Sequence, residues 1–190
     1  IQSIIGFFYL VTTRPFKVGD WIQVDGMHGE VSEIDWVKTT LLDIDLKTYR
    51  MSRRVTYIPN GRLVVNPIKN LNFVKRYVTH DFEIVRRESI NGFPIYDELY
   101  KRCLQYCEEF YDVAVRYNAI IERKLDASIF GPEPEIRFST TDIGDFKANI
   151  KLFCPTELAI ELEHKITSDF MQLWDEELDK KQLKYNDYKS

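Results

Sequence analysis

The stretch that decides the fold is residues 14–22, which read RPFKVGDWI. It follows an apolar run, IQSIIGFFYLVTT, that carries no charged side chain. Pro15 disfavours helical backbone at the residue before it, so we expect an apolar helix to end at Arg14. Arg14 and Lys17 stand just past that run, and basic residues in this place are typical of the cytoplasmic edge of a membrane helix.

The apolar run is too short to cross a bilayer by itself, since about 20 residues at 1.5 Å each are needed. A buried core strand would read much the same way, and that alternative stays open at this point. The run begins at Ile1 without a capping residue, so we expect a longer segment before it. Nowhere does the sequence hold roughly 18 or more consecutive uncharged apolar residues, the length of a complete membrane-spanning helix.

Downstream of this stretch, residues 16–68 follow a two-residue periodicity, which predicts strands. Asp25-Gly26 is a strong turn signal. The segments that favour strands are 21–24, 31–42, 55–58 and 63–65. Short strands at close spacing predict a small, curved β-barrel over residues 15–70. A barrel of this size is marginal alone, so association with copies of itself would help to stabilise it.

Residues 71–178 change character and predict a domain in the order β-α-β-β-α, which makes the fold class α+β. The predicted strands are 77–85, 136–138 and 146–152, and the predicted helices start at Pro94 and Pro155. The first helix is expected to run to about Leu125. Apolar residues at steps of three and four predict a core that contains Leu99, Phe110, Leu162 and Phe170. Residues 179–190 have no apolar face and are predicted to form a frayed tail.

The net charge of -4 conceals an asymmetry along the chain. Residues 1–80 hold 11 Lys and Arg against 7 Asp and Glu, whereas residues 81–190 hold 15 against 23. This predicts two modules with different neighbours, and the basic excess is too small to argue for nucleic acid. Three Cys are too few for a disulfide framework and favour a reducing compartment.

No residue pattern points to catalysis, a metal or a cofactor. The histidines fall in three separate elements and are predicted to be surface or capping residues: His28, His80 and His164. Cys103 and Cys107 lie four residues apart, but Cys154 alone does not complete a tetrahedral metal site, so we expect buried thiols that act as small hydrophobic groups. The phosphate, dinucleotide and nucleophile motifs are absent from the sequence, so we expect no enzyme.

The aromatic residues leave a nucleic-acid alternative open, because eleven Tyr and twelve Phe could stack on single-stranded bases. The matching cations would be Arg50, Arg53, Arg54 and Arg62. The same arginines could instead form a basic hairpin near anionic lipid headgroups, where each charge contributes ~1 kcal/mol. We favour the lipid interpretation, because these arginines share a module with the apolar run.

Residues 14–22, together with GEV at 29–31, TT at 39–40 and YIPNG at 57–61, resemble the small-conductance mechanosensitive channel (MscS) family. The motif residues that carry this resemblance are Arg14, Pro15, Phe16, Gly19, Asp20, Gly29, Pro59, Asn60 and Gly61. The order of elements in residues 71–178 also matches the next domain of that family. One departure is the apolar run itself: the family's pore helix usually packs through Gly and Ala, whereas Gly6 is followed here by FFY.

The resemblance implies a mechanosensitive ion channel that opens under membrane tension and releases ions and small osmolytes. Residues 1–14 would be the end of its pore-lining transmembrane helix. Residues 15–70 would form an Sm-like β-barrel and residues 71–178 a ferredoxin-like domain around a vestibule with side portals. The parent would be a multi-pass membrane protein and a homoheptamer, with this segment on the cytoplasmic or equivalent interior side. Its partners would be copies of itself and membrane lipids, with no nucleic acid and no cofactor.

The motif residues are expected to have structural roles rather than catalytic ones. Gly19 permits a turn between helix and barrel, and Asp20 can accept bonds from nearby backbone N–H groups. Residues 59–61 are predicted to form a rigid turn with positive φ at the glycine. Arg14 and Lys17 are predicted to couple force from the membrane. An Sm-like nucleic-acid-binding ring or a soluble ligand-sensing module remains as an alternative, which salt-dependent RNA binding or a thermal shift with a small molecule would favour.

Overall fold

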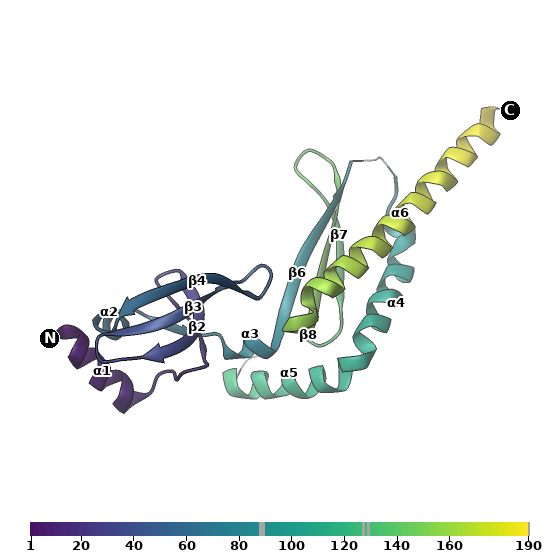
Figure 1. Ribbon diagram of the computed structural model, residues 1–190. Helices are drawn as coiled ribbons and strands as arrows, with labels where there is room; N and C mark the ends of the chain where they lie inside the picture. The colour runs from purple at the N-terminus through teal and green to yellow at the C-terminus, as the bar shows by residue number, and fades with distance from the viewer. Residues whose placement is uncertain (88–89, 127, 129, 190) are drawn as a thin grey trace. The chain divides into compact units, whose positions relative to one another are not determined.

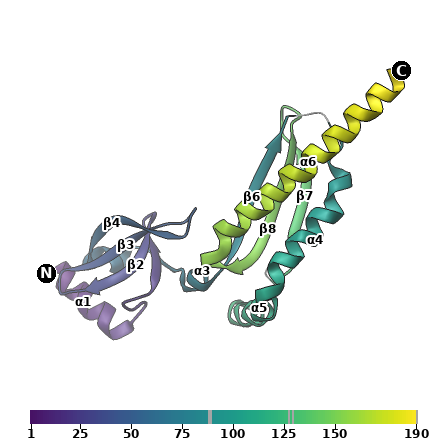
Figure 2. The same ribbon diagram turned by 45° about the vertical axis from the view of Figure 1, so that its right-hand side comes forward.

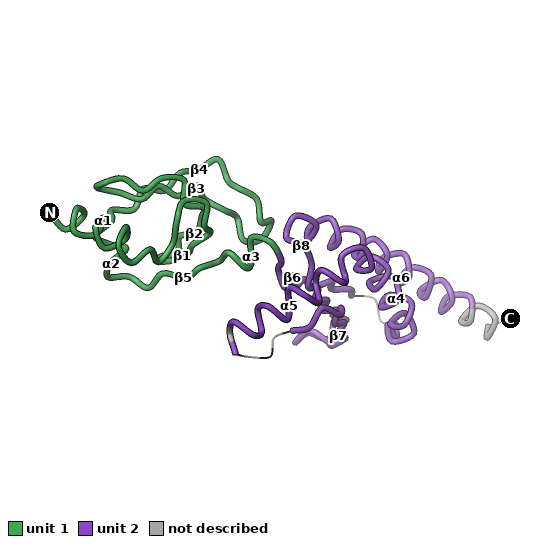
Figure 3. The backbone as a smooth tube through the Cα atoms, turned by 90° about the horizontal axis from the view of Figure 1, so that it is seen from below, with its two compact units in different colours: residues 1–76 green, residues 77–190 purple. Residues whose placement is uncertain are grey.

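The computed structural model describes residues 1–87, 90–126, 128 and 130–189 and shows a mixed α/β chain with two antiparallel sheets (Figure 1). It divides into two compact units, residues 1–76 and residues 77–190 (Figure 3).

The first unit consists of a helix, a five-stranded sheet and two short helices. Its strands lie in the order β4-β3-β2-β1-β5. The elements are α1 (Gln2–Thr13), β1 (Trp21–Val24), β2 (Met27–Ile34), β3 (Lys38–Asp45), β4 (Arg50–Pro59), α2 (Asn60–Val65), β5 (Ile68–Asn70) and α3 (Asn72–Arg76). The apolar run at the N-terminus is therefore a helix, and the alternative of a core strand is wrong.

Turn chemistry and bulges shape this sheet. Asp25 and Gly26 both have positive φ, 51° and 77°, which is the geometry of a two-residue hairpin turn between β1 and β2. The pairing of β2 with β3 shifts register between Val31 and Glu33, and the pairing of β3 with β4 shifts between Leu42 and Ile44. Bulges of this kind bend the strands, so the sheet curves around one apolar face.

The paired strands do not close the predicted β-barrel. β4 pairs with β3 and β5 pairs with β1, so these two strands are the outer edges of an open sheet. With three residues, β5 is too short to carry a second long ladder. Residues 63–65, predicted as a strand, instead belong to α2, which places Leu63 in the core and leaves Val64 and Val65 exposed.

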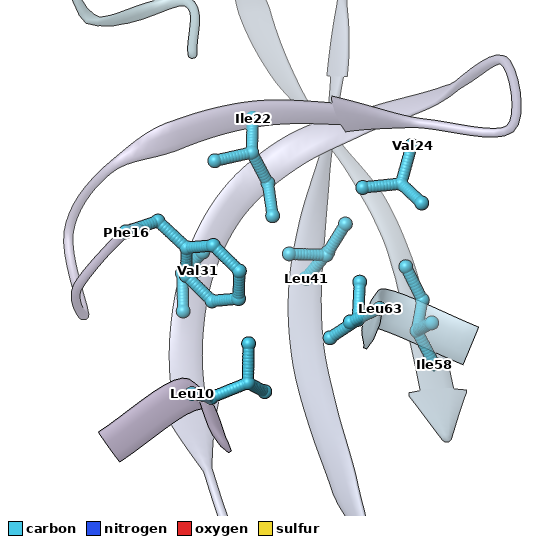
Figure 4. Close-up of a cluster of buried hydrophobic side chains, with 8 residues drawn as sticks. All are labelled: Leu10, Phe16, Ile22, Val24, Val31, Leu41, Ile58 and Leu63. Atoms are coloured by element: carbon cyan, nitrogen blue, oxygen red, sulfur yellow. The ribbon is translucent and has the colours of Figure 1, made fainter. Parts of the chain in front are cut away.

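The core of the first unit joins α1 to the sheet. Eight buried side chains from α1, the following turn, the strands and α2 converge on one another (Figure 4): Leu10, Phe16, Ile22, Val24, Val31, Leu41, Ile58 and Leu63. Because Leu10 is 3% exposed and Phe16 is 5% exposed, the end of α1 is held by the same core as the strands.

The second unit is a three-stranded antiparallel sheet in the order β6-β8-β7 with helices on one face. Its main elements are β6 (Tyr77–Arg86), α4 (Tyr96–Cys107), α5 (Tyr111–Leu125), β7 (Glu135–Thr140), β8 (Phe146–Pro155) and α6 (Ala159–Lys189). Figures 1 and 2 both show α6 running across the sheet with α4 beside it. The predicted order β-α-β-β-α is confirmed, and all four predicted core residues are buried: Leu99, Phe110, Leu162 and Phe170.

Two helix predictions for this unit are wrong. The helix expected from Pro94 to Leu125 is broken by a 3₁₀ turn at Glu108–Phe110, so α4 and α5 point in different directions (Figure 1). Neither Gly nor Pro marks this break, so the sequence carries no local signal for it. The helix α6 continues to Lys189 instead of fraying from residue 179.

Candidate functional site

The candidate site is the joint at which α1 meets the sheet of the first unit. α1 ends at Arg14, whose backbone is left-handed with φ 46° and ψ 55°. The Arg14 N–H donates to the Leu10 carbonyl at 2.9 Å, which is how a left-handed residue closes a helix. Pro15 follows directly and disfavours helical backbone at position 14.

A tight turn then carries the chain from α1 to β1. The Asp20 carboxylate accepts a bond from the Lys17 N–H at 3.0 Å, and the Asp20 N–H donates to the Lys17 carbonyl at 3.1 Å. Gly19 takes φ 91°, a region that other residues rarely adopt, and its N–H donates to the Val31 carbonyl at 2.8 Å. The turn is thus bonded both to itself and to β2.

Asn60 fastens the start of α2 to the turn between β2 and β3. Its side chain is fully buried: Nδ2–H donates to the Asp35 carbonyl at 2.7 Å, and Oδ1 accepts from the Thr39 hydroxyl at 2.9 Å. Its backbone N–H donates to the Val37 carbonyl at 2.9 Å. Three bonds thus engage the amide nitrogen, the amide oxygen and the backbone N–H of this buried residue, which is why asparagine suits this position.

The turn that Asn60 holds is itself ordered by a carboxylate. Asp35 Oδ1 accepts from the N–H groups of Val37 at 2.7 Å and Lys38 at 2.8 Å. These backbone bonds, that from Lys38 first, lower the pKa of Asp35 below its ordinary value.

α1 and α2 approach each other through two glycines. A Cβ added at Gly6 would come within 2.6 Å of both the carbonyl carbon and the carbonyl oxygen of Asn60. A Cβ at Gly61 would lie 3.3 Å from the Cβ of Gln2. Gly61 is a residue of α2 and is not among the glycines with positive φ, so the predicted role in a turn is wrong. Its lack of a side chain serves close packing instead.

Gly29 has a similar steric role in the sheet. A Cβ at this position would lie 2.5 Å from the Leu42 carbonyl oxygen on the neighbouring strand. Gly6 and the motif glycines Gly29 and Gly61 are therefore sites of close backbone approach, whereas Gly19 is needed for its positive φ.

Much of the apolar surface of α1 is exposed in the isolated chain. The exposed side chains include Ile1, Ile4, Ile5, Phe8, Tyr9 and Val11. Phe7 stacks on Trp36 with ring centroids 4.9 Å apart, and Phe8 meets the same indole edge-on at 6.1 Å. Trp36 lies in the turn that Asn60 holds, so aromatic contacts add a second attachment between α1 and this turn. Among the described residues, no helix has both the length and the apolar character needed to cross a bilayer.

The two basic residues of the joint are exposed and point away from the core. Within the described residues, the side chains of Arg14 and Lys17 form no ion pair, and the Arg14 side chain makes one long bond, 3.4 Å, to the Val11 carbonyl. Pro15, between them, is also exposed, whereas Phe16 is buried.

The four arginines considered for nucleic acid are spread over the unit. Arg50 begins β4 and Arg62 lies in α2 beyond the other end of that strand, so β4 separates them by roughly 30 Å. Arg54 pairs with Asp43 at 3.9 Å, and Arg62 pairs with Asp25 at 3.5 Å. They do not form one cationic path.

His80 and the three cysteines of the second unit are parts of its interior, whereas His164 is exposed. His80 is 5% exposed and its Nε2 lies 2.7 Å from Glu163 Oε2, so the prediction of a surface or capping histidine is wrong for this residue. All three cysteines are free and buried, as predicted; burial raises the pKa of Cys103 and Cys154 to about 12 and that of Cys107 to about 11. In the part of the chain that is described, no group of three or more His, Cys, Asp or Glu is placed to hold a metal ion.

Sequence reasoning identified most residues of the joint but missed the contact between Gly6 and Asn60. The available signal was a single glycine within an otherwise bulky helix, which often marks a close approach of backbone.

Comparison with known proteins gives the class to which this joint belongs. Residues 1–73 match the family model described as the mechanosensitive ion channel beta-domain. Among curated proteins, none matches the chain by sequence. MSL1 A320V from Arabidopsis thaliana has a similar structure, with a TM-score of 0.58 and 12% identity over 92% of this chain and 58% of that one. The closed state of Helicobacter pylori MscS gives a TM-score of 0.56 and 17% identity over 94% of this chain and 58% of that one.

The fold is thus that of a mechanosensitive channel. Residues 1–73 match the mechanosensitive ion channel beta-domain family, and the resemblance to the MscS family is confirmed. The chain spans somewhat more than half the length of the solved channels it resembles.

Proposed function

We propose that this chain lies at the inner mouth of a channel that opens under membrane tension and passes ions and small osmolytes. The observation that carries the proposal is the joint: an apolar helix with exposed side chains is held to the sheet by Leu10, Phe16 and the contact of Gly6 with Asn60. A force on α1 therefore acts directly on the sheet. The family that residues 1–73 match is one of ion channels, so we propose a transport role rather than catalysis.

We further propose that residues 1–14 are the end of the pore-lining helix of a multi-pass membrane protein, with the chain on the cytoplasmic or equivalent interior side. Residues 15–70 would be the Sm-like domain and residues 71–178 the ferredoxin-like domain. The return of β5 to pair with β1 supports the first assignment, and the order β6-β8-β7 supports the second.

The open edges of the sheet support self-association of the chain into a ring. The family resemblance suggests seven copies in that ring. β4 and β5 are unpaired on their outer sides, and such edges are normally covered. A contact between the β4 edge of one copy and the β5 edge of the next is head-to-tail, and head-to-tail contacts form a ring when the rotation between copies closes.

The basic end of the β3–β4 hairpin, around Arg50, does not support the lipid contact first considered for it. It lies roughly 30 Å along β4 from the end at which α1 and α2 meet. Lipid contacts are therefore assigned to α1, Arg14 and Lys17, and to the helices expected before Ile1.

Two measurements on the full-length parent protein test these proposals. Reconstituted into liposomes, it should give currents that appear when suction stretches the membrane; silence up to the tension that ruptures the patch would contradict a channel role. A mass measurement in detergent should give a ring of seven copies, and a monomer there would contradict self-association.

A further inference from the structure

The sheet of the second unit has a hollowed polar face opposite its helices. Along β6 burial alternates, so His80 and Phe82 face the helices while Asp81 and Glu83 face away. The hollow is lined by side chains from all three strands, among them Asp81, Arg137, Ser139, Lys147, Asn149 and Lys151. A core requirement does not explain this composition, because these side chains are exposed or half-buried.

Strand register arranges these residues in rows across the sheet. One row consists of Asp81, Lys151 and Glu135, and the next consists of Glu83, Asn149 and Arg137. Neighbours in such rows are close enough to interact.

Most of the charges on this face are paired across strands. Lys147 Nζ lies 2.6 Å from Glu83 Oε1, and Asn149 Nδ2–H donates to the same oxygen at 3.5 Å. Lys151 Nζ lies 3.5 Å from Glu135 Oε2, so this lysine is engaged by Glu135 on one side of its row.

Two charges remain on opposite sides of the hollow. Asp81 and Arg137 make no hydrogen bond or ion pair with any residue in the described part of the chain. They lie on the outer strands β6 and β7, with β8 between them, so about 10 Å separate their strands. An unpaired carboxylate and an unpaired guanidinium thus face one polar depression from its two sides.

We propose that this hollow binds small zwitterionic solutes, molecules with a carboxylate and an ammonium group at the ends of a short chain. The Arg137 guanidinium presents two parallel N–H donors that match a carboxylate, and Ser139 offers a hydroxyl on the same face of the same strand. Asp81 accepts the ammonium group across the hollow, and Asn149 lies between the two charged ends. This inference rests on the proposed function, since it names one class of solute that the channel would handle.

The site is open, so we expect weak binding with fast exchange. The dissociation constant should be in the millimolar range, which corresponds to a binding free energy of about 4 kcal/mol. The probes should be three molecules of equal carbon number: 4-aminobutyrate with both charges, butyrate with the carboxylate alone and butylamine with the ammonium alone. NMR titration of the 190-residue chain in a mild detergent, at constant pH and ionic strength, measures each affinity. With 4-aminobutyrate we expect saturable chemical-shift changes that centre on residues 81, 137 and 149. Each single-charge probe should bind about tenfold more weakly, because it lacks one charge-assisted hydrogen bond.

Two variants separate the ends of the site. R137Q should weaken 4-aminobutyrate and butyrate but leave butylamine unchanged, and D81N should weaken 4-aminobutyrate and butylamine but leave butyrate unchanged. The matched controls are R123Q on α5 and D179N on α6, exposed residues away from this face, which should bind all three probes as the parent chain does.

Shifts that never saturate, or equal binding of 4-aminobutyrate by R137Q and the parent chain, would overturn the proposal. This titration and the current recordings test different proposals. If no solute binds, tension-activated currents still support the channel role. If no currents appear, the titration still shows whether the hollow binds solutes.

Discussion

Gly6 of α1 lies against the backbone of Asn60 so closely that a methyl group at position 6 would meet the Asn60 carbonyl at 2.6 Å. Asn60 in turn holds the Asp35 carbonyl in the turn between β2 and β3 and the Thr39 hydroxyl in β3. A displacement of α1 at Gly6 is therefore transmitted to the strands through two contacts in series. These two contacts are the route by which we propose that force on α1 reaches the sheet.

The first prediction concerns the close approach itself. G6A should destabilise the attachment of α1 by about 1–3 kcal/mol from overpacking, less the ~1 kcal/mol that alanine contributes to helix propensity. Amide hydrogen exchange of residues 2–13 and 60–65 measures the effect. G131A is the control, because a Cβ there meets no atom within 4 Å and the position has no positive φ. Unchanged or slower exchange in G6A would show that the contact is not tight.

The second prediction concerns the buried amide. N60A should lower the free energy of unfolding of the first unit by about 2–4 kcal/mol, because the Thr39 hydroxyl and the Asp35 carbonyl lose their partner in the core. N66A, at a half-buried position with an exposed bond to Asp25, should cost less than about 1 kcal/mol. Urea denaturation followed by the fluorescence of Trp21 and Trp36 compares the variants, after W174F removes the indole of the second unit. Equal midpoints for N60A and N66A would contradict the role assigned to Asn60.

Local chemistry made much of this fold predictable. The end of α1 at Arg14 follows from Pro15, the β1–β2 hairpin from Asp25-Gly26, and the core of the second unit from apolar steps of three and four. Each depends on neighbours in sequence, and so it can be read without knowledge of the tertiary structure.

The features that were missed depend on distant partners. Leu63 belongs to a helix because the core accepts one leucine from α2, not because its own sequence disfavours a strand. The role of Gly61 is set by α1 more than fifty positions away, and His80 is buried because Glu163 on α6 meets it. The open sheet likewise reflects how few residues β5 contributes to pairing, which the apolar pattern does not specify.

The third prediction concerns the buried thiols. Their pKa values are raised to about 12, 11 and 12 for Cys103, Cys107 and Cys154, whereas a thiol in the unfolded chain titrates near pH 8.5. Above that pH the unfolded state loses these protons first, so stability is intact below about pH 8.5 and falls as the pH rises toward the folded values. Each thiol should contribute up to about 1.4 kcal/mol per pH unit in this window.

Urea denaturation between pH 8 and 10.5 tests this dependence. Lys and Tyr also titrate in part of that range, so the matched comparison is the variant with all three cysteines changed to alanine. Its stability should be lower at pH 8 but should fall less steeply with pH; parallel curves for the two proteins would contradict the assignment to the thiols.

The last prediction separates charge from backbone at the end of α1. Arg14 is left-handed, a conformation that asparagine tolerates well, so R14N removes the charge while it keeps the helix end. K17Q removes the second charge and leaves its backbone bond to Asp20 intact. Only contacts that differ between the closed and open states can shift the equilibrium between them. If Arg14 and Lys17 make such contacts with lipid headgroups or neighbouring helices, R14N/K17Q shifts the tension at which the full-length channel opens. R53Q, at an exposed position of β4 away from the joint, is the control for charge alone. Patch-clamp recordings at matched expression decide whether these charges couple to gating or only solvate the helix end. An unaltered opening tension in R14N/K17Q means that they only solvate the helix end, where exposed charges contribute ~0–1 kcal/mol to stability.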